Sequence, residues 1–158
     1  MKEEFLFYFG PESEFSHWFK CEFVIQGIRF RCAEQYIMFQ KAMLFGDMEI
    51  KNRILRSANP SRHRYLGKRV NDFNKERWHR NCRQFAFDAN SSKFSQNPPL
   101  LESLLRTAGK SLAEASPYDK IWGIGLSIQN PKIYDRAQWR GRNWAGEALE
   151  AVRAKLLK

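Results

Sequence analysis

The first hydrophobic positions of the chain are arranged for strands. Residues 5–9 read Phe-Leu-Phe-Tyr-Phe and end at Gly10-Pro11, so this short aromatic run of high β propensity predicts a buried strand. Residues 23–30 contain two short apolar runs separated by Gln26-Gly27, which is typical of a hairpin turn. We expect the strand and the hairpin to be joined by a polar and aromatic loop at residues 14–18.

From residue 32 onwards the apolar residues recur at the three- and four-residue spacing of helices. Residues 32–42 contain neither Gly nor Pro and only one β-branched residue, Ile37, which favours a helix. Capping residues, prolines at a first helical position and terminal glycines delimit the other helices. We expect these at residues 48–56, 60–67, 74–94, 98–109 and 143–157.

The pattern changes at residues 112–126, where Gly123 and Gly125 lie close to Trp122. Glycines inside an apolar run predict a short strand followed by a loop rather than a helix. The whole set of elements predicts an α+β fold. We expect one mainly helical domain over residues 1–158, with a small antiparallel sheet formed by N-terminal and C-terminal segments.

The formal net charge of +10 favours anionic partners such as phosphate esters, nucleotides or nucleic acid, and does not choose among them. Three cysteines without C-x-x-C spacing indicate reduced thiols. The three histidines form no H-x-x-x-H pair, so we expect no metal site. The longest apolar run is residues 5–9, and no signal-peptide pattern is present. We therefore expect a cytoplasmic protein without membrane contact.

Glu34 and Lys41 are the first candidates for chemistry. Residues seven apart on a helix lie nearly above one another, about 20° out of register, so the two side chains share a face. Their backbones lie roughly 10 Å apart along the helix axis. A carboxylate and an amine on one face either form the wall of a site or lie on a solvated edge, and the spacing does not decide between the two.

Two further groups of residues have chemical potential. Asp119 precedes Trp122 by three positions, and the glycines that follow would let a ligand approach the backbone closely. Arg140 and Arg142 lie between two tryptophans, where backbone N–H groups before the last helix could hold a phosphate. The structural alternatives are a tryptophan that fills the core beside a turn, and a basic helix cap with packing tryptophans.

Carboxylates, aromatic faces and cations together suit hydrolysis of an N-glycosidic bond in a nucleotide-like substrate. An anion would stabilise the oxocarbenium-like centre while an acid protonates the departing base. This extends the two-carboxylate logic of O-glycosidases to an N-glycoside.

Short motifs along the chain are similar, in the same order, to those of a known domain family. They are Phe15-Ser16-His17-Trp18, Ala33-Glu34-Gln35-Tyr36, Gln40-Lys41-Ala42, Leu44-Phe45-Gly46-Asp47, Leu66-Gly67-Lys68, Trp78, the run from Leu112 to Gly125, Trp139-Arg140-Gly141, and Asn143 with Gly146. The run from Leu112 to Gly125 is the most specific match. The chain resembles the NADAR family, the NAD- and ADP-ribose-associated domain also described as YbiA-like, from about Phe5 to the C-terminal helix.

The resemblance implies an N-glycosidase that needs neither metal nor cofactor. Some members of the family hydrolyse early phosphoribosylamino-pyrimidine intermediates of riboflavin biosynthesis, and others remove ADP-ribose from guanine bases, including guanine in nucleic acid. By position, the resemblance implies Glu34, Lys41 and Asp119 as catalytic residues. With the patterns above, the expected substrate-binding residues are Ser16, His17, Gly67, Trp78, Trp122, Gly123, Arg140, Arg142 and Asn143.

Two departures from the family pattern are visible. The family often has His after the motif Glu, where this chain has Gln35, so a titrating imidazole at that place is not essential. The loop that usually reads Ser-Asn or Ser-Gln reads Ser16-His17 here. His17 would supply a donor that relatives provide through an amide, or it reflects variation within the family.

The hypothesis for the reaction follows from these residues. Glu34 acts as general acid and base or stabilises positive charge at the anomeric carbon. Lys41 either keeps Glu34 ionised and binds phosphate, or forms a Schiff base with C1 of the opened sugar. Asp119 binds ribose hydroxyls or serves as the second carboxylate. Trp78 and Trp122 stack on the base, and the two arginines bind phosphate.

For the substrate, the positive charge favours ADP-ribosylated guanine, either as a free nucleotide or within DNA or RNA, since a strand needs a basic rim. Such a substrate suggests a functional link to an ADP-ribosyltransferase. The first alternative is a phosphoribosylamino-pyrimidine intermediate of riboflavin biosynthesis. The alternative from another class is a non-catalytic module that binds nucleotide or nucleic acid.

Overall fold

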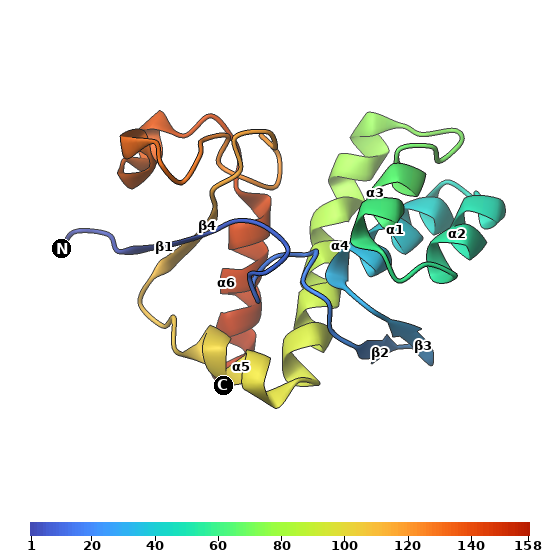
Figure 1. Ribbon diagram of the computed structural model, residues 1–158, viewed down its shortest axis with the longest axis horizontal. Coiled ribbons are helices and arrows are strands. Elements are labelled where there is room, and N and C mark those ends of the chain that lie inside the picture. The colour runs from blue at the N-terminus through green and yellow to red at the C-terminus, as the bar shows by residue number, and fades with distance from the viewer. The chain divides into compact units, whose positions relative to one another are not determined.

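The computed structural model describes residues 1–158, which group into two units (Figure 1). The first unit combines Met1–Phe19 with Pro98–Lys158, and the second consists of Lys20–Asn97. Six α-helices and four short strands make an α+β protein, as the sequence predicts. That residues 1–158 act as one domain stays a prediction.

Strand β1 (Phe5–Tyr8) pairs with strand β4 (Ser111–Glu114) in the first unit. The two strands run parallel, with Phe5 opposite Ser111 and Tyr8 opposite Glu114. The predicted pairing of N-terminal and C-terminal segments is correct, but its antiparallel orientation is wrong. A parallel pair requires a long connection instead of a hairpin, and here the connection includes all of residues 20–97.

The rest of the first unit is built on this strand pair. Helix α6 (Trp144–Leu156) packs against β4, and helix α5 (Pro98–Leu105) packs against α6 (Figure 1). Two short 3₁₀ helices, η1 (Pro131–Tyr134) and η2 (Arg136–Gln138), precede α6. Residues shared by strand, loop and 3₁₀ helix make one apolar core: Ala113, Ala115, Ile124, Leu126 and Ile133.

Helix α5 ends at Leu105, earlier than the predicted stop at Gly109. The reason is the buried Thr107, whose hydroxyl donates to the Leu104 carbonyl oxygen at 2.6 Å. The Arg153 guanidinium of α6 also donates to the Thr107 carbonyl oxygen at 2.9 Å. These bonds stabilise a turn in place of a further helical turn.

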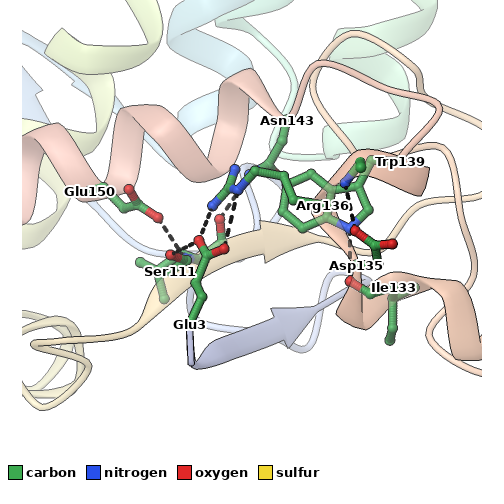
Figure 2. A network of polar contacts seen from close by, with 10 residues as sticks. Glu3, Ser111, Ile133, Asp135, Arg136, Trp139, Asn143 and Glu150 are labelled. Carbon is green, nitrogen blue, oxygen red and sulfur yellow. Dashed lines mark hydrogen bonds and ion pairs between the residues drawn. The ribbon is translucent and has the colours of Figure 1, made fainter. Parts of the chain in front are cut away.

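A polar network holds the start of β1 against β4 and the 3₁₀ helices (Figure 2). The Ser111 hydroxyl donates to the Glu3 carboxylate at 2.6 Å, and the Arg136 guanidinium forms an ion pair with the same carboxylate. The hydrogen bond from Arg136 is the main reason that the pKa of Glu3 is lowered. Arg136 also lies 4.5 Å from the centre of the Trp139 ring, whose Nε1 donates to the Ile133 carbonyl oxygen at 2.8 Å.

The second unit begins with the predicted hairpin of β2 (Phe23–Ile25) and β3 (Ile28–Phe30), which pair antiparallel. Gln26 and Gly27 have φ values of +50° and +79°. A two-residue turn of type I′ requires positive φ at both central positions, so the sequence signal and the geometry agree.

Four helices follow the hairpin close to their predicted bounds: α1 (Ala33–Leu44), α2 (Met48–Leu55), α3 (Pro60–Gly67) and α4 (Lys75–Ser95). Asp47 and Asn59 cap α2 and α3 with side-chain oxygens, as their sequence positions predict. Asn74, expected as the first residue of its helix, caps α4 in the same way. Helix α1 contacts each of the other three helices and β3 (Figure 1). None of the helices in the structure combines the length and the apolar character that crossing a membrane requires.

Gln35 connects the first turn of α1 to the end of α2. Its side-chain oxygen accepts a hydrogen bond from the Arg31 N–H at 2.7 Å. Its amide nitrogen donates to the carbonyl oxygens of Ile54 and Ser57, both at 3.0 Å. The side chain is 1% exposed, so the amide at this position is used entirely for structure.

We predict that Gln35→Ala lowers the free energy of unfolding by about 2–4 kcal/mol, because three backbone groups each lose a hydrogen bond to a buried side chain. Gln40→Ala is the matched control on the same helix. Gln40 donates only to the Tyr36 hydroxyl and is half-buried, so its loss should cost about 1 kcal/mol or less. Urea denaturation measures both, and equal costs would contradict the role assigned to Gln35.

Candidate functional site

Lys41 lies in the last turn of α1 with its amine among aromatic rings. Its Nζ is 4.6 Å from the centre of the Phe73 ring and 5.4 Å from the centre of the Trp78 ring. Trp78 belongs to the first turn of α4, and Phe73 to the segment that precedes this helix. The two ring faces attract the ammonium form of the amine, while their bulk keeps water from much of the side chain.

Burial lowers the pKa of Lys41 below its ordinary value, because the charged form loses hydration. The Glu34 carboxylate acts in the opposite direction and raises this pKa, whereas Lys68 lowers it further. Glu34 is therefore close enough to sense the amine, as expected for two side chains on one helix face. Both are half-buried, which is intermediate between the solvated edge and the buried wall that the sequence left open.

Gly67, the last residue of α3, lies directly over α1. A Cβ at this position would lie 2.1 Å from the Met38 sulfur, a distance that no pair of non-bonded atoms tolerates. The absence of a side chain at Gly67 thus lets α3 approach α1. This packing is one physical reason for a glycine here, and a substrate contact at Gly67 stays a prediction.

In the first unit, Asp119 shapes the loop between β4 and η1. Its Oδ1 accepts hydrogen bonds from the N–H groups of Ile121 and Trp122 at 2.9 and 2.8 Å. The Ser116 hydroxyl oxygen holds the preceding turn by accepting from the N–H groups of Tyr118 and Asp119. The second oxygen of the half-buried Asp119 carboxylate makes no hydrogen bond within the protein, so it is available to a ligand.

Trp122 lies between two other rings. The imidazole of His17 meets it edge to face at 5.5 Å between ring centres, and Trp144 does so at 6.1 Å. His17 and Ser16 are 6% and 5% exposed, and the Ser16 hydroxyl oxygen accepts from the Trp18 N–H at 3.1 Å. The loop at 14–18 and the loop at 119–125 therefore meet at His17 and Trp122. That Ser16, His17, Asp119 and Trp122 share a substrate site stays a prediction.

The backbone N–H groups at the start of α6 already have hydrogen-bond partners within the protein. Five N–H groups of residues 140–145 donate, at 2.8–3.1 Å, to the carbonyl oxygens of residues 120–124. The donors are Arg140, Arg142, Asn143, Trp144 and Ala145. These groups are not open to a phosphate, which corrects our expectation for this segment. Any anion here would have to be held by the exposed side chains of Arg140 and Arg142.

The same contact explains Gly123. A Cβ there would lie 2.9 Å from the Ser116 Cβ and 3.0 Å from the carbonyl oxygens of Asp119 and Glu114. The carbonyl oxygen of Gly123 accepts from the Asn143 N–H. The protein's own backbone therefore makes the close approach that the sequence suggested for a ligand.

Asn143 is 2% exposed and has a φ of +56°, a left-handed conformation that Asn tolerates better than most residues. Its side-chain oxygen accepts from the Glu114 N–H at 3.0 Å, and its amide donates to the Leu112 carbonyl oxygen at 2.9 Å. Further along α6, Glu150 accepts from the Leu112 N–H at 2.7 Å (Figure 2). Both side chains serve as partners for the backbone of β4, so Asn143 positions this strand.

The predicted site residues thus form two groups. Glu34, Lys41, Gly67 and Trp78 belong to the second unit, and Ser16, His17, Asp119, Trp122, Gly123, Arg140, Arg142 and Asn143 to the first. The structure adds Phe73, which the sequence reasoning missed. The sequence marks Phe73 only as a single large apolar residue in the polar stretch 71–77. No group of three or more His, Cys, Asp or Glu side chains is placed to hold a metal ion.

Comparison with known proteins agrees with these motifs. The model of the NADAR domain matches residues 6–157. Protein irg-1 of Caenorhabditis elegans is 43% identical over 132 residues, which are 82% of this chain and 62% of that protein. N-glycosidase R617 of Acanthamoeba polyphaga mimivirus is 38% identical over 162 residues, which cover 96% of this chain and 95% of that protein.

More distant similarity extends to a protein of Vibrio vulnificus named as a riboflavin biosynthesis protein. It is 24% identical over 98% of this chain, and the chain spans 39% of its length. The NMR structure of Escherichia coli YbiA has the same fold, with a TM-score of 0.80, 23% identity, and coverage of 99% of this chain and 87% of that one. The resemblance seen in the motifs is thereby confirmed: the chain belongs to the NADAR family.

Proposed function

We propose that this protein is an N-glycosidase that hydrolyses the bond between a ribose carbon and a base in a nucleotide-like substrate. The observation that carries the proposal is the pairing of a desolvated amine, Lys41, with the Glu34 carboxylate on one face of α1. A relative named as an N-glycosidase, similar along almost its whole length, supports the same activity.

The chemistry needs few groups. When the bond from the anomeric carbon to the base nitrogen breaks, its electron pair leaves with the base, which takes up a proton. Positive charge develops on the sugar carbon and ring oxygen, and a water oxygen then forms the new bond. Glu34 is the proposed acid and base, since one carboxyl group can give a proton to the base and later take one from water. As an anion it also stabilises the positive sugar.

Lys41 is proposed to act as a nucleophile. Its lowered pKa increases the fraction of neutral amine near neutral pH, and only the neutral amine can attack C1 of the ring-opened sugar. The bond from C1 to the base then breaks, and the base leaves with the electron pair and a proton. The Schiff base left between C1 and Lys41 is hydrolysed by the attacking water, which releases the sugar and restores the amine. The alternative role is electrostatic: a protonated Lys41 would hold Glu34 ionised and bind phosphate. The burial of the side chain favours the first role, because it opposes the hydration of the ammonium form that the electrostatic role requires.

The other residues are proposed as substrate contacts. Trp78 and Trp122 offer ring faces for a base, and the free oxygen of Asp119 can accept from a ribose hydroxyl. Arg140 and Arg142 are exposed cations for phosphate. Ser16 and His17 lie in the same loop as Trp18. We propose that this loop brings them into contact with the substrate.

For the substrate we propose ADP-ribosylated guanine, with release of ADP-ribose. The net charge of +10 supports an anionic substrate that carries two phosphates or lies within a strand. A second candidate is a phosphoribosylamino-pyrimidine intermediate of riboflavin biosynthesis. The observation that favours it is the similarity to a protein named for riboflavin biosynthesis.

The decisive experiment measures ADP-ribose released from an ADP-ribosylated guanine oligonucleotide, beside turnover of a phosphoribosylamino-pyrimidine. We predict that the wild-type protein releases ADP-ribose and that Glu34→Gln lowers the rate at least ~100-fold, the usual scale for a general acid and base. Circular dichroism should show that the variant is folded. If neither substrate turns over while both bind, the protein is a binding module and not an enzyme.

For Lys41 we predict that borohydride, added during turnover, traps a covalent sugar adduct that mass spectrometry locates on this residue. Because burial lowers the pKa of Lys41, the rate should rise with pH and level off below the ordinary lysine pKa of about 10.4. Phe73→Ser hydrates the amine and should move the rise to higher pH. If borohydride traps no adduct and the Lys41→Arg variant keeps most of its activity, the role of Lys41 is electrostatic and not nucleophilic.

Asp119 has a structural oxygen and a free one, and two variants separate them. We predict that Asp119→Asn keeps the acceptor for the N–H groups of Ile121 and Trp122 and changes stability by about 0.5 kcal/mol or less. Asp119→Ala leaves both groups without this partner and should cost about 1–3 kcal/mol. A carboxylate that takes part in the reaction would show as lost turnover in the stable Asp119→Asn variant. Full activity there would limit Asp119 to shaping the loop.

A further inference from the structure

The positive charge of the chain is concentrated on one short stretch. Residues 50–71 contain seven lysines and arginines and no aspartate or glutamate. The seven are Lys51, Arg53, Arg56, Arg62, Arg64, Lys68 and Arg69. This stretch covers α3 and most of α2, which pack against each other, and we call their outer surface the α2–α3 basic face. The first turn of α2 adds one exposed carboxylate, Glu49.

The cations of this face are not neutralised by ion pairs. None of its seven cations forms an ion pair within the protein, and five of the seven are exposed. The contacts that they do make are to backbone oxygens and a ring: Arg56 donates to the Asn52 carbonyl oxygen at 3.3 Å, and Arg69 lies 3.6 Å from the centre of the Tyr65 ring. Arginines held in this way keep donor groups free for an outside partner.

An open hollow of about 640 Å³ marks the centre of the face. It lies between the end of α2 and the start of α3 and is lined by Arg53, Arg56, Arg62 and the polar residues of the connecting segment, Ser57 and Asn59. A second hollow of about 270 Å³ adjoins it at Ala58 and is lined by two cations, Lys20 and Arg31, and one carboxylate, Glu22. Five cations therefore border two connected depressions.

The cations of this face are spread over an area that suits a chain of phosphate groups better than a single phosphate. Each of the two helices has eight residues and is about 12 Å long, so the cations are spread over more than the width of one phosphate group. An anionic membrane fits less well, since surface-binding helices insert an apolar face, whereas Ile50, Ile54 and Leu66 are buried in the protein. Tyr65 is 43% exposed between Arg62 and Arg69 and adds a flat ring beside the charges, as single-strand binders do.

We propose that the α2–α3 basic face binds the phosphate backbone of single-stranded nucleic acid, with the hollow at Arg53, Arg56 and Arg62 as its principal phosphate site. This inference rests on the proposed function. By holding a strand, the surface lets the enzyme act on guanine within single-stranded nucleic acid and not only on a free nucleotide. A base in a single strand is reached without the cost of unpairing a duplex.

The test uses the full chain and a fluorescein-labelled single-stranded DNA of twenty nucleotides without modification, so that binding is measured without turnover. The variant Arg53→Ala/Arg56→Ala/Arg62→Ala is compared with Lys110→Ala/Lys132→Ala/Lys158→Ala, which removes the same charge from exposed lysines of the first unit. We expect the arginine variant to bind about tenfold or more weakly, and the lysine variant to change less than about twofold.

Salt dependence gives an independent measure. Three lost phosphate contacts should reduce the slope of log affinity against log salt concentration by about 2, since each contact on a single strand contributes about 0.7. The exposed pair Arg56→Gln/Arg62→Gln, which spares the half-buried Arg53, should reduce it by about 1.4 if the triple variant does not fold. Equal losses in the arginine and lysine variants, or an unchanged slope, would overturn the proposal.

Two further measurements separate the possible failures. Vesicles with 30% phosphatidylserine should not compete with the oligonucleotide, and preferential binding of the vesicles would overturn the proposal. The arginine variant should keep turnover of an ADP-ribosylated guanosine mononucleotide but lose it on an oligonucleotide. Binding of DNA by a protein without any turnover would refute the proposed enzyme and keep this surface. Equal turnover of the mononucleotide and the oligonucleotide by the arginine variant would refute the role of this surface and keep the proposed enzyme.

Discussion

The burial of α1 is the constraint on which the second unit depends. Seven of its twelve residues are buried, because the helix contacts α2, α3 and α4. Such a helix has only a narrow strip on which side chains can meet a ligand, and that strip contains Glu34 and Lys41. The packing also supplies the chemistry, since burial lowers the pKa of Lys41, whose amine lies against the rings of Phe73 and Trp78. The packing that buries α1 therefore also lowers the pKa of Lys41.

In the first unit, ordinary backbone groups perform the tasks that the sequence assigned to ligand binding. The row of carbonyl oxygens at 120–124 satisfies the N–H groups that begin α6, and the Asn143 amide satisfies the backbone of β4. Glycines at 123 and 141 allow these segments to touch, since a Cβ at Gly141 would lie 2.1 Å from the Gly123 carbonyl oxygen. What this loop still offers to a ligand is side chains: the free oxygen of Asp119, the ring of Trp122, and two exposed arginines.

The sequence predicted features that depend on neighbours along the chain. Helical spacing, the caps at Asp47 and Asn59, and the Gln26-Gly27 turn are local, and the structure confirms them. The orientation of β1 against β4 depends on the path of about a hundred intervening residues, which no local pattern specifies. The roles of Asn143 and Gly67 have the same character, because their partners lie on distant segments. Phe73 beside Lys41 could not be inferred for that reason, although its residue type marked it as unusual.

The pairing of β1 with β4 also has a consequence for the order of events during synthesis. Residues 20–97 are contiguous, so this whole unit has been synthesised before the chain reaches Ser111–Glu114. Throughout that interval the aromatic strand Phe5–Tyr8 has no partner strand. Domains fold as their segments emerge, and the nascent chain must therefore keep this strand from other unpaired strands until its second half arrives. Between the two strands of the pair, the chain forms no strands other than those of the hairpin at 23–30, which limits the competing partners for Phe5–Tyr8.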